Sequence, residues 1–128
     1  PFDKEDAELN RRTVYRFSPR GQRSAILDAF DCPDPSTTAP KRSVTTTPIQ
    51  ALALLNNAFV LRMSDGFSER LKKESDSLNE QVKKAYELAY SRNPDDEELR
   101  LGIELSKKHG LSALCRVLFN SNEFVVIE

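Results

Sequence analysis

Apolar residues recur at helical spacing through most of the second half of the chain. In five segments they lie three or four residues apart, which is the period of an amphipathic α-helix. These segments lie at about 48–56, 58–74, 77–91, 96–109 and 111–120, and a shorter one covers 22–31. No segment offers two convincing alternating strands. The pattern therefore predicts an all-α domain of five or six helices that bury a shared core in one bundle.

Short capping motifs predict where several of these helices begin and end. A Ser, Thr or Asp followed three residues later by Glu or Gln can satisfy two free backbone N–H groups reciprocally. Three such boxes are expected, pairing Thr47 with Gln50, Ser77 with Glu80 and Asp95 with Glu98. Asn56-Asn57 predicts a break between two helices, because short amide side chains compete for backbone hydrogen bonds. Gly110, after three basic residues, is typical of a helix C-terminus.

The remaining segments lack helical periodicity. Residues 1–10 are acidic and are interpreted as a linker or arm, and residues 11–20 as an extended segment. Residues 32–47 contain three prolines before position 41, which favours a long ordered loop over a helix. An apolar tail is expected over 121–128. The domain prediction is therefore a single all-α domain over 11–128.

Composition and charge narrow the class of protein. The chain has 128 residues, of which 38% are hydrophobic and 30% charged, as in a soluble globular protein. No apolar run approaches the ~18 residues of a membrane span. The net charge of -1 excludes a globally basic nucleic-acid binder, although residues 9–48 carry +4 and the remainder -5. The basic patch consists of Arg11, Arg12, Arg16, Arg20 and Arg23. The first residue is Pro, which suggests a processed chain or an excised piece.

The cysteine and histidine content argues against a metal centre. There are two cysteines and one histidine, without a C-x-x-C motif, so no metal site and no attached heme are expected. Cys115 lies on an apolar helical stripe and is interpreted as a core residue. Cys32 lies beside the proline-rich loop. A disulfide between Cys32 and Cys115 is left open.

The loop before the predicted helix at 48–56 holds the candidate binding residues. Basic residues and hydroxyls precede a helix N-terminus there, and such an end can bind an anion. The candidates are Asp31, Asp34, Lys41, Arg42, Thr45, Thr46 and Thr47. No catalytic residue is assigned: His109 lies at a charged helix end, and turn-forming contacts account for aspartates beside prolines.

Several blocks of sequence resemble a known family. They include Phe30-Asp31-Cys32-Pro33-Asp34-Pro35-Ser36, the run from Pro40 to Leu52 with Thr45-Thr46-Thr47-Pro48, and Leu54 to Val60. Arg11 to Phe17, Ser91-Arg92-Asn93-Pro94 with Ser91 in place of a usual Gly, and Leu118 to Phe124 extend the match. These blocks resemble the C-terminal domain of unknown function of large planctomycete-type surface proteins with cytochrome-c-like domains upstream.

The resemblance implies context more than mechanism. It implies an exported protein of the periplasm or cell surface, with no cofactor in this chain and any heme in upstream domains. The leading hypothesis is a non-catalytic C-terminal module that docks onto those upstream domains or onto an envelope protein. One alternative is part of an enzyme of redox chemistry or polysaccharide breakdown, with its site in the 31–47 loop. Another is binding of anions or, less favoured, nucleic acid through the basic 11–42 region.

Overall fold

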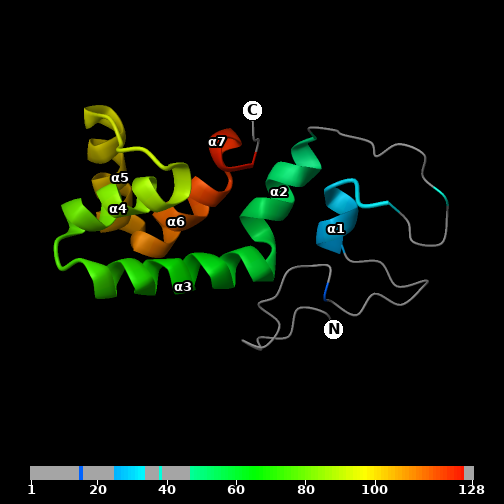
Figure 1. Ribbon diagram of the computed structural model, residues 1–128, viewed down its shortest axis with the longest axis horizontal. Helices are drawn as coiled ribbons and strands as arrows, with labels where there is room; N and C mark the ends of the chain where they lie inside the picture. The colour runs from blue at the N-terminus through cyan, green and yellow to red at the C-terminus, as the bar shows by residue number, and fades with distance from the viewer. Residues whose placement is uncertain (1–14, 16–24, 34–37, 39–46, 126–128) are drawn as a thin grey trace. The chain divides into compact units, whose positions relative to one another are not determined.

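The computed structural model describes Tyr15, residues 25–33, Thr38 and residues 47–125 (Figure 1). The chain divides into two compact units, Pro1–Ala53 and Leu54–Glu128, and each is described by itself. The single domain expected over 11–128 stays a prediction.

Every regular element in the described part of the chain is a helix, which confirms the all-α class. The helices are α1 (Ala25–Ala29), α2 (Pro48–Asn56), α3 (Ala58–Glu74), α4 (Leu78–Tyr90), α5 (Asp96–His109), α6 (Leu111–Phe119) and α7 (Asn122–Val125). The five longer helices lie within a few residues of the predicted ranges.

The last helix, α7, forms where the sequence predicted an apolar tail. Ser121 begins it, because its Oγ accepts a hydrogen bond from Phe124 N at 3.2 Å. The Phe124 ring then lies 5.0 Å from the Phe119 ring of α6, centroid to centroid. A local cap and one aromatic contact thus turn part of the tail into a short helix, which hydrophobicity alone did not indicate.

Two of the three predicted capping boxes are present. Asp95 accepts from Glu98 N at 2.7 Å, and Glu98 accepts from Asp95 N at 2.9 Å. Thr47 and Gln50 form the same reciprocal pair at 3.4 and 3.2 Å. The predicted break between α2 and α3 is also confirmed, because Asn57 is the N-cap of α3.

The predicted box at the start of α4 is absent. Ser77 has the extended backbone of an N-cap, but its side chain makes no capping hydrogen bond. Instead Gln81, one position beyond Glu80, donates its Nε2 to the carbonyl of Ser75 at 2.7 Å. Gln81 is buried, so this bond closes the α3–α4 connection from inside the turn.

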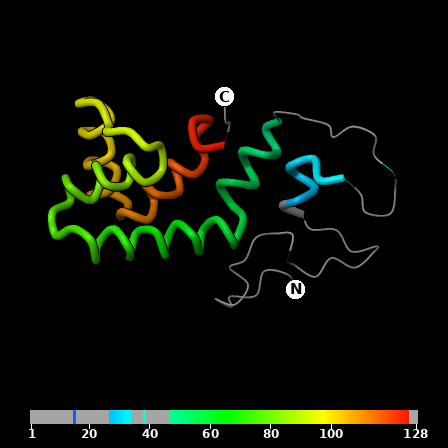
Figure 2. Tube along the Cα trace, viewed as in Figure 1, coloured from blue at the N-terminus to red at the C-terminus, as the bar shows by residue number. Residues whose placement is uncertain are grey.

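The core of the second unit is built around α6. This helix packs against α3, α4, α5 and α7, and Figures 1 and 2 show α3, α4, α5 and α6 folded back on one another. Cys115 of α6 is completely buried, as its place on the apolar stripe predicted. The core residues are Leu71, Val82, Ala85, Tyr86, Leu111, Leu114, Cys115 and Leu118.

Gly102 allows α5 to approach α4 closely. A Cβ atom at this position would lie 2.9 Å from Cγ1 of Val82 and 3.7 Å from Cδ1 of Leu114. Val82 is completely buried and β-branched, so its side chain has little freedom to move away. The close packing of α4 and α5 therefore depends on the missing side chain.

We expect Gly102→Ala to lower the free energy of unfolding by about 0.5–2 kcal/mol, because the usual cost of overpacking a core, about 1–3 kcal/mol, exceeds the gain of about 0.5–1 kcal/mol from alanine as the better helix former. Urea denaturation followed by circular dichroism measures this change. Gly66→Ala in α3 is the matched control, because a Cβ there meets nothing within 4 Å. The control should gain about 0.5–1 kcal/mol, since alanine is the better helix former. Equal effects of the two substitutions would contradict the account of Gly102.

Candidate functional site

Few of the binding residues predicted from the sequence lie in the described part of the chain. Asp31 follows α1 with a left-handed φ of 56°, and its Oδ2 lies 3.5 Å from Nε2 of Gln50. Gln50 in turn pairs with Thr47, so the first unit brings these three residues together. The other candidates lie outside the described residues and stay predictions: Asp34, Lys41, Arg42, Thr45, Thr46, and the patch of Arg11, Arg12, Arg16, Arg20 and Arg23.

Both cysteines are free thiols in the structure, and the disulfide between them stays an open alternative, because they belong to units that are described separately. Cys32 is exposed, whereas Cys115 lies in the core. Burial raises the pKa of the Cys115 thiol to about 12. Its thiolate is therefore scarcely populated near neutral pH, and the residue acts as a small apolar group.

Arg92 joins three helices through its guanidinium group. It donates from Nη1 and Nη2 to the two carboxylate oxygens of Glu98, at 2.8 and 2.7 Å. It donates from Nε and Nη2 to the two oxygens of Glu123, at 2.6 and 2.9 Å. The fifth N–H group donates to the carbonyl of Asn93 at 3.2 Å. All five donors of the side chain are used, and we call this set of contacts the Arg92 clamp.

Two tyrosines of α4 support the clamp. The guanidinium carbon lies 5.7 Å from the ring centroid of Tyr86 and 5.5 Å from that of Tyr90, within the range of cation–π attraction. The hydroxyl of Tyr90 donates to Oγ of Ser121 at 2.7 Å, and Ser121 donates to the carbonyl of Leu118 at 2.9 Å. The end of α4 is therefore tied to the α6–α7 connection as well.

The clamp changes the acidity of its members. Hydrogen bonds from Arg92 lower the pKa of Glu98 to about 2 and also lower the pKa of Glu123. Hydrogen bonds to the two glutamates, Glu98 first, raise the pKa of Arg92. Since every donor of the guanidinium already has a partner inside the chain, the clamp is a structural device with no donor to offer a ligand.

Ser91 ends α4 in a left-handed conformation. Its φ and ψ are 58° and 26°, and its N–H donates to the carbonyl of Glu87 at 2.9 Å. This conformation costs an L-residue energy that glycine does not pay. A glycine would adopt this conformation without strain, so glycine suits the position before Arg92 better than the serine found there.

A groove lies between α5 and α6, beside the clamp. Its volume is about 470 Å³. Leu101 and Val117 line it and are 49% and 50% exposed, although the opposite faces of their helices belong to the core. The lining residues are Tyr86, Glu98, Leu101, Gly102, Glu104, Leu105, Lys108, His109, Leu114 and Val117. Tyr86 and Glu98 belong to both the clamp and the groove.

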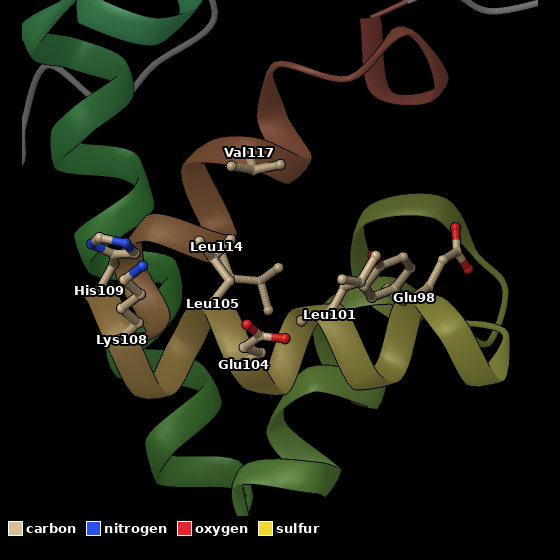
Figure 3. A pocket seen from close by; sticks show the side chains of 10 residues that line it. Glu98, Leu101, Glu104, Leu105, Lys108, His109, Leu114 and Val117 are labelled. Atoms are coloured by element: carbon tan, nitrogen blue, oxygen red, sulfur yellow. The ribbon is translucent and has the colours of Figure 1, made fainter.

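The groove continues into a second hollow of about 520 Å³. The two share Leu105, His109 and Val117, and the second also includes Arg116 and Leu61. Figure 3 shows Lys108 and His109 at one end of α5 and Glu98 toward the other, with Leu101 and Leu105 between them. The groove therefore has leucines along its middle, with the carboxylate of Glu104 beside them, and ends of opposite charge.

The chemistry that the groove offers is that of its apolar walls and its charged ends. Within the described residues, no three His, Cys, Asp or Glu side chains are grouped so that they could hold a metal ion. Apolar walls with charged ends suit the side chains of a second helix. Sequence reasoning missed this site, although the separation of Leu101 and Leu105 by four residues, and Val117 lying off the core stripe of its helix, were visible signals.

Among the described residues, no helix combines the length and the apolar character needed to cross a membrane.

Comparison with known proteins identifies one relationship. The model of a family described as "Protein of unknown function (DUF1553)", with the short name PSD1, matches residues 2–105. No curated protein and no solved structure matches the chain.

We expect Ser91→Gly to raise the free energy of unfolding by about 0.5–1 kcal/mol. Relief of the left-handed conformation, about 1–2 kcal/mol, exceeds the added freedom of glycine in the unfolded chain, about 0.5–1 kcal/mol. Urea denaturation measures the gain. Ser91→Ala is the control and should show no gain, because alanine keeps the same backbone penalty. A stabilised alanine variant would count against this explanation.

We expect the Arg92 clamp to make the free energy of unfolding decrease as the pH falls. The pKa of Glu98 is lower in the folded than in the unfolded chain, where glutamate titrates near ~4.3. Its contribution to stability is therefore complete above that pH and is lost as the pH falls toward about 2. In Arg92→Gln the carboxylates lose these donors, so the decline in stability between about pH 5 and pH 2.5 should become shallower.

The matched control removes an arginine from an exposed pair. Arg70 lies 2.7 Å from Glu74 within α3, with a side chain that is 58% exposed. Arg70→Gln should change the free energy of unfolding by only about 0.3–0.5 kcal/mol and leave the acid decline as steep as in the wild type. Thermal unfolding at a series of pH values provides both curves. An unchanged slope in Arg92→Gln would refute the role of the clamp.

Proposed function

We propose that this chain, which belongs to the DUF1553 family of proteins of unknown function, is a non-catalytic docking module. The observation that carries this proposal is the apolar groove between α5 and α6. Its function in this account is to receive a helix of a protein partner.

The exposed apolar side chains support a docking role. Leu101 and Val117 are about half exposed on two packed helices, so their positions do not depend on a loop. Covering them with another apolar surface is favourable by roughly 25 cal/mol for each Å² removed from water. Leu114, 2% exposed, and Gly102 anchor the floor of the groove in the core, so little ordering is needed before a partner binds.

The charges around the groove indicate the chemistry of the partner. Lys108 and His109 end α5, with Arg116 nearby on α6, whereas acidic residues begin α5. A fitting helix has apolar residues along one face, acidic residues at the end that meets Lys108, and basic residues at the other end. Such a helix runs antiparallel to α5.

The wider setting is proposed from the family resemblance. In that setting the module follows heme-binding domains of an exported protein and associates with those domains or with an envelope protein. The loop over 31–47 and the basic segment before it remain a second candidate contact, and Asp31 and Thr47 are the candidate binding residues of the loop that the structure describes. The capping bonds of Thr47 give this loop a regular junction with α2.

We expect a partner to protect the groove from chemical modification in the assembled protein. Val117→Cys, in a Cys32→Ser background, places a thiol in the groove, and the buried Cys115 should react far more slowly. The thiol at position 117 should be alkylated by iodoacetamide several-fold more slowly in the complete native polypeptide than in this chain. The complete polypeptide is assayed in an extract of the cells that produce it, and this chain at low micromolar concentration.

Leu88→Cys is the matched control. Leu88 is 37% exposed on α4 and lines neither hollow. Its alkylation should be equally fast in both preparations. Equal rates at Val117→Cys in the assembled protein and in the dilute chain would remove the docking proposal.

A further inference from the structure

Four of the α5 residues that line the groove are placed symmetrically along the helix, with opposite charges at the two ends, and Gly102 and Glu104 also line the groove between them. Glu98, Leu101, Leu105 and Lys108 follow one another at spacings of three, four and three residues, so they form one stripe along the helix. Ile103 lies midway between these residues in sequence but on the opposite face of α5, packed against the core. When a second copy of α5 is laid antiparallel across the stripe, centred at the level of Ile103, each leucine meets the other leucine and each Glu98 meets Lys108.

The ends of the helix repeat the same polarity. The first turn of α5 carries Asp96, Glu97 and Glu98, and the last turn carries Lys107, Lys108 and His109. An antiparallel pair brings each acidic turn beside a basic turn. It also brings the positive end of one helix dipole beside the negative end of the other, whereas a parallel pair would bring like charges together.

We propose that the occupant of the groove is α5 of a second copy of this chain, related to the first by a twofold axis that passes between Leu101 and Leu105 on the groove side of the helix. This inference rests on the docking function proposed above and names its partner. In the resulting interface Leu101 of one copy packs against Leu105 of the other, beside Val117. The contact is isologous, so it closes on itself as a dimer.

The carboxylate of Glu98 has room for this contact. It accepts two hydrogen bonds from Arg92 and one from Asp95 N. A carboxylate can accept about four hydrogen bonds, so one site is left for Lys108 of the other copy. The Arg92 clamp therefore holds Glu98 in position and leaves one acceptor site of its carboxylate for the second copy.

The size of the interface predicts a weak dimer. A helix of 14 residues is about 21 Å long, so one helix pair buries less than the ~1,200 Å² of a standard interface. We therefore expect monomers at low micromolar concentration and a dimer that becomes detectable at roughly 100 µM. Weak affinity suits an interface that other parts of a larger assembly reinforce.

Sedimentation velocity of the whole chain from about 5 to 500 µM tests the proposal over the range in which weak dimers form. The wild type should show a concentration-dependent dimer. Leu101→Asp should raise the dissociation constant at least ten-fold, and so should Lys108→Glu, which places two acids opposite each other. Leu88→Asp, on an exposed site outside the groove, is the control and should dimerise as the wild type does.

Disulfide trapping tests the direction of the helices. In a Cys32→Ser background, Leu101→Cys mixed with Leu105→Cys should form crosslinked dimers under mild oxidation, whereas Lys108→Cys alone should not. Crosslinking of Lys108→Cys to itself would show parallel helices and overturn the proposal.

The outcomes separate this inference from the docking function. A monomer at every concentration, with Val117→Cys still protected in the complete polypeptide, overturns the second copy and assigns the groove to another segment or to an envelope protein. A dimer that Leu101→Asp leaves intact also overturns it, because the contact then lies elsewhere. If the chain stays monomeric and Val117→Cys is unprotected, both proposals fall.

Discussion

Arg92, which lies in the connection between α4 and α5, determines how the end of α4 and the starts of α5 and α7 meet in the second unit. All five N–H groups of Arg92 have acceptors, and four of these acceptors are the oxygens of two carboxylates from the starts of α5 and α7. The guanidinium also lies over two tyrosine rings of α4. A planar, permanently charged group with this many fixed donors orients its partners, which a lysine in the same place could not do. The blocks 91–94 and 118–124, which are distant in sequence, are thereby joined into one structural unit.

The clamp also shapes the candidate site. Tyr86 and Glu98 contact Arg92 on one side and line the groove on the other, so the acidic end of the groove is held by the same bonds. Gly102 completes the arrangement, because a larger residue would push α5 away from Val82. The groove is thus a consequence of how α5 is anchored. Its leucines and charged ends are the features on which the proposed docking of a helix depends.

Local patterns were reliable where the forces are local. Helical spacing predicted the five longer helices, and two capping boxes were found at Thr47 and Asp95, since these bonds join residues three positions apart. The box at Ser77 was wrong because a different local bond, from the buried Gln81 to the carbonyl of Ser75 six positions earlier, closes that turn instead. The helix α7 was missed because the contact of its Phe124 ring with Phe119 is not visible in the spacing of apolar residues along the chain.

The sequence by itself determined the fold class, most helix ends and membership of a family of unknown function, because periodicity, caps and motif blocks are properties of neighbouring residues. It also contained the stripe of Glu98, Leu101, Leu105 and Lys108. Only the tertiary structure decided which apolar residues are left at the surface. Leu114 and Val117 are three positions apart and similar in hydrophobicity, yet one is 2% and the other 50% exposed. The reason is that the packing angle of α6 against α3 and α5 selects which face is buried, and that angle depends on contacts between residues far apart in the chain.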